Sequence, residues 1–240
     1  MREIRLEEID STNSYAKLNL DNLADKTVIH AAIQTSGRGR LNRKWVDLGL
    51  GNLFMSIVLK PEDKYAASFA NLTQYLSVCL CKVLESYNLK PQIKWPNDVL
   101  IDGKKIAGIL SESVVQSSGK SKGIILGIGV NLNADEQSLH NIPDKIATAL
   151  NVEIGKQIDV DIFRHELINE FFSNYDSFIE VGFEFIKQDY ILRNCFIGKE
   201  LNIQLFDEIK NGFAKSVNDR GELILMDNDK ELVLTIGDIL

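Results

Sequence analysis

The stretch Val99-Leu-Ile-Asp-Gly-Lys-Lys-Ile-Ala-Gly-Ile-Leu110 predicts a β-hairpin in the middle of the chain. Two apolar runs flank the dipeptide Asp102-Gly103, which is a strong signal for a tight two-residue turn. Further runs rich in β-branched residues lie on both sides of this hairpin. Because short turns join these runs in a row, we expect a largely antiparallel sheet.

The remaining strands and helices can be placed outward from the hairpin. Strands are expected at 27–33, 53–59, 93–95 and 124–131, with a polar loop at 117–123. Helices are expected at 65–87, 143–150, 160–180 and 182–193, and a first helix follows the capping residues of Asp10-Ser-Thr-Asn13. The pattern predicts an α+β fold in which helices flank a mixed, largely antiparallel sheet.

The character of the sequence changes after Gly198. Short alternating strands at 201–205, 212–217, 222–226 and 232–236 are separated by turn residues. Such short strands in so few residues indicate a small barrel of SH3-like size. We therefore expect a catalytic domain at 1–193 and a C-terminal barrel domain at 194–240.

Charge and composition exclude several classes of protein. The net charge is −7, which argues against broad affinity for nucleic acid. No apolar run reaches the roughly 18 residues that a membrane span needs, and the acids near Met1 argue against a signal peptide. The three cysteines lack metal-ligand spacing, so we expect reduced thiols in a cytoplasmic protein.

A positive loop stands out on this acidic chain. The segment Ser36-Gly-Arg-Gly-Arg-Leu-Asn-Arg-Lys-Trp45 has no acid, and its arginines offer planar forks for phosphate oxygens. Gly37 and Gly39 allow close approach of the backbone to an anion, and Trp45 could pack on a ligand ring. A plain basic surface loop remains an equal alternative for this segment alone, and an RNA contact is disfavoured by the overall charge.

Two further segments carry polar groups that packing alone does not require. Lys94-Trp-Pro-Asn-Asp98 crowds polar side chains around a Trp-Pro step, so that Asp98 could hold Mg²⁺ or orient an amine, and Asn97 could bind a base or ribose. Lys105 begins the second hairpin strand beside the small Ala107 and Gly108, where it could neutralise charge in a transition state. A solvated hairpin lysine is the simpler interpretation of Lys105 taken alone. The sequence has no P-loop, no serine-nucleophile elbow and no histidine metal cluster.

Taken together, these segments resemble the biotin protein ligase family. Six segments occur in the same order and at the same spacing as in that family. They are Asp10-Ser-Thr-Asn13, Gln34 to Trp45, Gly51-Asn-Leu53, Lys94-Trp-Pro-Asn-Asp98, Lys105-Ile-Ala-Gly-Ile-Leu110 and Gly127-Ile-Gly-Val-Asn131. The resemblance implies a class II synthetase-like catalytic domain with a C-terminal SH3-like barrel. It also implies a ligase that forms biotinyl-5'-AMP from biotin and ATP with Mg²⁺, and then biotinylates a lysine of a biotin carboxyl carrier protein.

The resemblance also implies roles for individual residues. The implied biotin-binding residues are Ser11, Thr12, Asn13, Gln34, Arg38, Gly39, Arg40 and Lys105. The implied nucleotide-binding residues are Gly37, Arg38, Arg40, Arg43, Trp45, Asn97 and Asn131. The implied catalytic residues are Lys105, Arg40 and Asp98, with Asp98 also the candidate Mg²⁺ ligand.

The chain departs from the family pattern in places. Asn42 stands where a glycine is usual, and because Asn tolerates left-handed torsions we expect the loop to form. The short tail after Ile236-Gly-Asp-Ile239 puts a C-terminal nucleotide contact in doubt, and the early start of the motifs predicts a ligase without a DNA-binding domain. A homodimer is compatible with the resemblance. The alternatives are a lipoate or octanoate ligase or transferase and a non-catalytic biotin or nucleotide binder.

Overall fold

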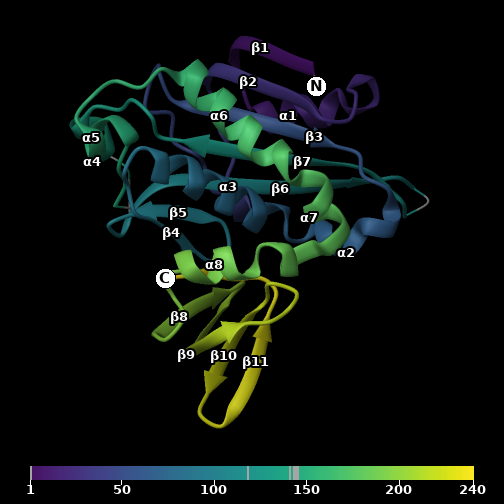
Figure 1. Ribbon diagram of the computed structural model, residues 1–240, viewed down its shortest axis with the longest axis vertical. Coiled ribbons are helices and arrows are strands. Elements are labelled where there is room, and N and C mark those ends of the chain that lie inside the picture. Colours follow the sequence, from purple (N-terminus) through teal and green to yellow (C-terminus); the bar gives the residue numbers. More distant parts are fainter. Residues whose placement is uncertain (1, 118, 141, 143–145) are drawn as a thin grey trace.

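The computed structural model describes residues 2–117, 119–140, 142 and 146–240. A seven-stranded sheet forms its upper body, in the order β1-β2-β3-β7-β6-β5-β4 (Figure 1). Its strands are β1 (Arg2–Ile9), β2 (Thr27–Gln34), β3 (Leu53–Leu59), β4 (Pro91–Lys94), β5 (Asp98–Ile101), β6 (Lys104–Val115) and β7 (Ser121–Val130). Only the β1–β2 pair is parallel among these neighbours, which confirms the expected mixed, largely antiparallel sheet.

The predicted hairpin is formed by β5 and β6. Asp102 and Gly103 both have positive φ, at 47° and 75°, as a tight turn matched to the twist of the strands requires. Asp98 pairs with Gly108, and Gly108 pairs in turn with Gly129 of β7. The hairpin therefore places the Trp-Pro segment beside the lysine strand β6, at the β4 end of the sheet.

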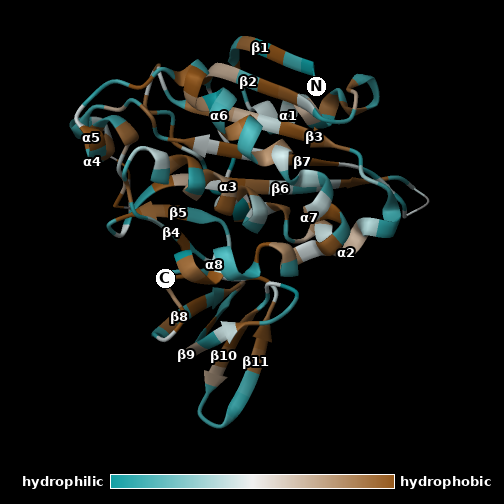
Figure 2. Cartoon of the chain, viewed as in Figure 1, coloured by the Kyte–Doolittle hydropathy of each residue, from teal (hydrophilic) through white to brown (hydrophobic). Residues whose placement is uncertain are grey.

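The two faces of the large sheet are covered by different helices. Alternate residues of one strand divide between two apolar clusters, since Ile125 belongs to the cluster under α1 (Thr12–Leu18), whereas Ile124 and Leu126 belong to the main core. The main core packs against α3 (Leu72–Ser86) and α6 (Val160–Ser173). Figure 2 shows the apolar residues concentrated along the strands and the polar residues on the turns and outer helix faces.

The other helices are short. They are α2 (Ala66–Phe69), α4 (Glu136–His140), α5 (Leu150–Ile154), α7 (Tyr175–Val181) and α8 (Lys187–Arg193). Short 3-10 turns lie at Leu20–Asn22, Arg40–Asn42, Asp63–Tyr65 and Gly182–Phe185. Among the residues described, none of the helices has both the length and the apolar character needed to cross a bilayer.

A five-stranded antiparallel sheet follows α8 and projects from the lower end of the body (Figure 1). Its strands are β8 (Glu200–Leu205), β9 (Glu208–Val217), β10 (Leu223–Asp227), β11 (Lys230–Leu234) and β12 (Asp238–Ile239), in the order β11-β10-β9-β8-β12. This agrees with the small C-terminal β-unit expected from the sequence. Its buried Ile203, Ala214 and Leu225 join the same apolar cluster as the large sheet, and the boundary at 193/194 remains a prediction.

Several elements differ from the expected ones. Strand β1 was not predicted, because its side chains are mainly charged; an edge strand tolerates them since it is largely exposed. The helix expected at 65–87 is broken before α3, where the Asn71 side chain binds the Arg220 carbonyl of the C-terminal unit. The helix expected at 160–180 is divided at Asn174. Residues 143–145 of the helix expected at 143–150 lie outside the described residues, whereas 146–149 are not helical and the helix α5 begins only at Leu150, so this prediction was wrong over its described part. One residue of the loop expected at 117–123 also lies outside the described residues, and β7 already begins at Ser121.

Candidate active site

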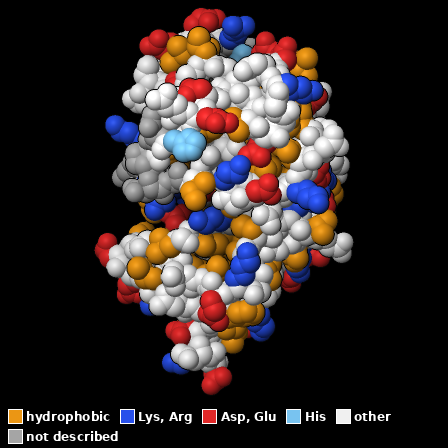
Figure 3. Space-filling view, turned by 90° about the vertical axis from the view of Figure 1, so that its left-hand side faces the viewer, with side chains coloured by type: hydrophobic (Ala, Val, Ile, Leu, Met, Phe, Trp, Pro, Cys, Tyr) orange, Lys and Arg blue, Asp and Glu red, His pale blue; other side chains and the backbone are white. Residues whose placement is uncertain are grey.

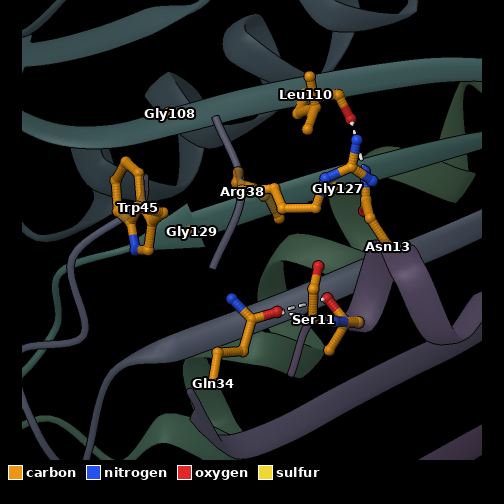
Figure 4. A pocket seen from close by; sticks show the side chains of 11 residues that line it. Ser11, Asn13, Gln34, Arg38, Trp45, Gly108, Leu110, Gly127 and Gly129 are labelled. Carbon is orange, nitrogen blue, oxygen red and sulfur yellow. Dashed lines mark hydrogen bonds between the residues drawn. The ribbon is translucent and has the colours of Figure 1, made fainter. Parts of the chain in front are cut away.

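A small cavity lies on the α1 face of the large sheet, beneath the loop that follows β2 (Figure 4). It is lined by Ser11, Thr12, Asn13, Gln34, Arg38, Trp45, Gly108, Leu110, Gly127, Ile128 and Gly129. Five of the predicted biotin-binding residues, from the segments 10–13 and 34–45, are thus brought together. The free space is about 30 Å³, room for about one water molecule, and Figure 4 shows the side chains of Arg38 and Trp45 lying across it.

Buried hydrogen bonds fix the polar side of this cavity. The Gln34 side-chain oxygen accepts from the Thr12 backbone N–H at 2.7 Å and from the Thr12 hydroxyl at 3.1 Å. The Ser56 hydroxyl lies 2.6 Å from the Asn13 side-chain oxygen and 2.7 Å from the Thr12 hydroxyl. A buried network with these partners holds each group in one orientation. The cavity therefore presents a fixed set of donors and acceptors at the N-terminus of α1.

Glycines make the floor of the cavity flat. A Cβ placed on Gly127 would lie 2.1 Å from Oδ1 of Asn13, and one on Gly129 would lie 2.5 Å from Cε2 of Trp45. A Cβ on Gly108 would lie 2.8 Å from Cζ3 of Trp45. Side chains approach the strands of β6 and β7 too closely for any other residue type. The motif containing Gly127 and Gly129 owes its glycines to this close approach.

The arginine–glycine loop is an ordered strap over the cavity. The Gly39 N–H donates to the Arg43 carbonyl at 2.8 Å, and the Trp45 N–H donates to the Gly37 carbonyl at 2.9 Å. The left-handed torsion inside the loop falls on Leu41, with φ 52°. The loop therefore forms with Asn42 in place of the usual glycine. The left-handed torsion lies at Leu41, the residue before Asn42.

The arginines of this loop point to two different carboxylates. Arg38 makes a bidentate ion pair with Glu112 of β6, with distances of 3.0 and 3.1 Å. Arg40 and Arg43 lie 2.8 and 2.7 Å from the two oxygens of Asp238 in β12, at the C-terminal sheet. Figure 3 shows Lys and Arg side chains gathered near the junction of the body and the C-terminal sheet. The loop is thus tied both to the cavity and to the C-terminal unit.

A second cluster of predicted residues lies beside the cavity. Nζ of Lys105 lies 2.5 Å from Oδ1 of Asp98 and 5.4 Å from the centre of a Trp45 ring. The Asn97 side chain donates to the Ile109 carbonyl and accepts from Arg40 at 3.3 Å. Trp45 thus separates the cavity from a charged cluster that holds all three predicted catalytic residues. An ammonium and a carboxylate in contact suit charge neutralisation and proton transfer.

One predicted residue has its amide engaged inside the fold. Asn131 is buried; its side chain donates to the Thr148 carbonyl at 3.0 Å, and its backbone N–H donates to the Ile106 carbonyl. This arrangement joins β7 to the segment before α5. A role at the adenine stays a prediction for Asn131.

A Mg²⁺ ion at this site would need donors besides the carboxylates of the protein. Among the residues that the structure describes, no group of three or more His, Cys, Asp or Glu side chains could hold a metal ion. Asp98 supplies one carboxylate at the charged cluster, next to Lys105. This donor set fits Mg²⁺ only in the common arrangement in which one or two carboxylates share the ion with substrate phosphates.

Sequence reasoning missed three residues that shape the site. Ser56 orients Asn13, Glu112 binds both Asn13 and Arg38, and Asp238 binds the other loop arginines. The strand period of two from Gly108 and Leu110 would have placed Glu112 on the cavity face. Asp238 carries no such signal, because its contact is made across about 200 residues.

Comparison with known proteins identifies the family. A model of the "Biotin/lipoate A/B protein ligase family" matches residues 6–131, more than half of the chain. The bifunctional ligase/repressor BirA of Bacillus subtilis is 31% identical over 92% of this chain and 68% of its own length. The biotin–[acetyl-CoA-carboxylase] ligase of Paracoccus denitrificans is 30% identical over 92% of both chains. The solved biotin protein ligase of Aquifex aeolicus, in complex with biotin and ATP, superimposes with a TM-score of 0.84 at 28% identity, over 100% of this chain and 97% of its own.

The chain belongs to the biotin/lipoate A/B protein ligase family. Within that family, the Bacillus, Paracoccus and Aquifex proteins named above carry biotin-ligase names. These relatives, together with the Arg-Gly-Arg loop, place the chain with the biotin ligases rather than with the lipoate enzymes.

Proposed function

We propose that this protein is a biotin–[biotin carboxyl carrier protein] ligase, which activates biotin with ATP and transfers it to a lysine of a carrier domain. The observation that carries the proposal is that Trp45 lies between the predicted biotin-binding residues of the cavity and the predicted catalytic residues. A polar cavity at α1 lies on one side of this ring, and the cluster of Lys105, Asp98 and Arg40 lies on the other. A ligand with a carboxylate-ended chain would bridge them.

The first step joins two anions. An oxygen of the biotin carboxylate bonds to the α-phosphorus of ATP, and the bond to pyrophosphate breaks. The repulsion between them is lowered by the guanidinium groups of Arg38, Arg40 and Arg43 and by the ammonium of Lys105. Bound Mg²⁺, with Asp98 as its protein ligand, would neutralise phosphate charge. This electrostatic stabilisation is large where water is excluded from the site. We assign the exclusion of water to the arginine–glycine loop.

The second step moves the biotinyl group to an amine. The acceptor lysine attacks the carbonyl carbon of the mixed anhydride, the carbon–oxygen bond to AMP breaks, and the amine loses a proton. The Asp98 carboxylate, 2.5 Å from Lys105, is the base available in this cluster. Lys105 then stabilises the negative charge on the departing phosphate.

The remaining parts of the proposal concern the surroundings of the enzyme. The partner is the carrier domain of a biotin-dependent carboxylase, in line with the name of the Paracoccus relative. The exposed edge strand β1 supports pairing of two copies through their sheets. The free Cys79, Cys81 and Cys195 support a cytoplasmic location, and the net charge of −7 supports a function without nucleic acid.

Pyrophosphate release with each candidate acid tests the proposal. Purified protein with ATP, Mg²⁺ and biotin should release pyrophosphate, whereas lipoate or octanoate in place of biotin should not support release. Release with lipoate alone would favour the sister enzymes, and release with neither acid would exclude the catalytic function. Arg40→Gly should retain the adenylate poorly, which would appear as biotin on lysines of bystander proteins.

A further inference from the structure

One carboxylate links the cavity to the arginine loop. Glu112 lies on β6 four residues after Gly108, so that the two residues share the cavity face of the strand. Its side chain is 15% exposed. Its Oε2 accepts from the Asn13 amide nitrogen at 3.0 Å and from Arg38 at 3.0 Å, and its Oε1 accepts from Arg38 at 3.1 Å. Three segments distant in sequence therefore meet at this group.

The charge of Glu112 determines which way the Asn13 amide faces. An ionised carboxylate can only accept hydrogen bonds, so it binds the NH₂ end of Asn13. The oxygen end is thereby turned to the Ser56 hydroxyl at 2.6 Å and lies directly over Gly127. A reversed amide would set its oxygen against the carboxylate and leave the Ser56 hydroxyl facing an NH₂ group. Glu112 thus fixes the acceptor that Asn13 offers at the cavity, together with the Leu110 carbonyl, which accepts from the same amide nitrogen at the longer distance of 3.4 Å.

The same carboxylate holds the loop before an anion arrives. Both guanidinium NH₂ groups of Arg38 bind Glu112 in the bidentate geometry, which fixes direction as well as distance. The Arg38 side chain is 41% exposed, so water and salt weaken this pair and the arginine can exchange partners. The loop is therefore kept near its closed position without being locked there.

We propose that Glu112 is a positioning residue for biotin: it orients the Asn13 amide and pre-places Arg38, and it takes no part in the bond-making steps. This inference rests on the proposed function. Because Glu112 acts on the shape of the free site, its loss weakens biotin binding and leaves the rate at saturating biotin near that of the wild type.

Calorimetric titration of biotin into the ATP-free protein tests the inference, starting with the wild type. Glu112→Gln removes the charge and keeps the shape, and we expect biotin Kd to rise roughly tenfold with less than a twofold change in kcat. Glu85→Gln is the matched control. Glu85 makes a similar bidentate pair with Arg193, at 2.7 and 2.9 Å, remote from the cavity, and its biotin Kd should stay at the wild-type value.

A rescue experiment separates orientation from general damage. Asn13→Asp places a carboxylate against Glu112 and should weaken biotin binding severely. Adding Glu112→Gln to that variant supplies an NH₂ group that can donate to the new carboxylate, so the double variant should bind biotin more tightly than Asn13→Asp alone. This comparison holds even if the Glu112→Gln single variant unfolds.

The outcomes distinguish a failure of the positioning role of Glu112 from a failure of the proposed function. A wild-type protein that binds no biotin would refute the proposed function. Normal biotin binding by folded Glu112→Gln, or a lowered kcat with unchanged Kd, would overturn the positioning role while leaving the ligase function intact. A double variant no better than Asn13→Asp would likewise overturn it.

Discussion

Replacing Gly127 by alanine tests the floor of the cavity. The added Cβ would lie 2.1 Å from Oδ1, 2.8 Å from Cγ and 3.0 Å from Nδ2 of the Asn13 side chain. These contacts are far inside normal packing distances, so Asn13 has to leave its bonds with Ser56 and Glu112. The change therefore disturbs the polar network without altering any polar residue.

The size of the effect follows from what Asn13 loses. The buried bond to Ser56 and the partly buried bond to Glu112, at about 0.5–1.5 kcal/mol each, correspond to roughly a 5- to 150-fold change in affinity. Overpacking of a tight site costs about 1–3 kcal/mol of folding stability. We therefore expect Gly127→Ala to fold with a lowered Tm and to bind biotin at least about fivefold more weakly.

Calorimetric titration with biotin, beside thermal unfolding, measures both effects. Ile124→Val is the control, since it removes a buried methylene from the same strand on the opposite face, at a cost of about 0.5–1.5 kcal/mol. Its Tm should fall, with biotin Kd unchanged. If Gly127→Ala bound biotin as the wild type does, the contact between Gly127 and Asn13 would have no part in the site, and the cavity would be wrongly assigned.

Three further predictions concern other parts of the molecule. Lys105→Ala should lower the rate of pyrophosphate release roughly 100- to 1,000-fold, whereas Lys104→Met, which loses only a pair with Glu153, should keep it within about threefold. Asp238→Ala leaves Arg40 and Arg43 without their carboxylate, so urea unfolding should show a loss of about 1–3 kcal/mol in the free energy of unfolding; an unchanged urea midpoint would refute a stabilising role for these ion pairs. Burial, and then nearby Arg164, lower the pKa of His30 below its ordinary 6.5. The unfolded chain therefore takes up this proton first, stability falls as pH drops through about 6.5, and His30→Gln should flatten that part of the stability–pH curve.

The sequence was sufficient wherever a signal is local. The turn at Asp102-Gly103 defined the hairpin of β5 and β6, and the strand period and the short connections predicted the largely antiparallel sheet that contains it. The glycines of the loop and the capping residues before α1 likewise marked segments that meet at the cavity. These features depend on backbone torsions and near neighbours, which sequence patterns describe directly.

The parts that could not be predicted depend on contacts between distant segments. Strand β1 is held by pairing with β2 and not by its own composition, which is mainly charged. The direction of each loop arginine is set by Glu112 and by Asp238, and no local pattern relates these acids to the loop. The ends of α3 and α6 differ from the predicted ones for the same reason, since contacts with other elements determine where a helix stops.

Mass spectrometry of the carrier domain after incubation with the protein, biotin, ATP and Mg²⁺ tests the central claim most directly. We predict that the intact mass rises by one biotinyl group, that the added group maps to a single lysine, and that a carrier with arginine at that position stays unmodified. An unmodified carrier under conditions in which the protein binds biotin and ATP would contradict the ligase function.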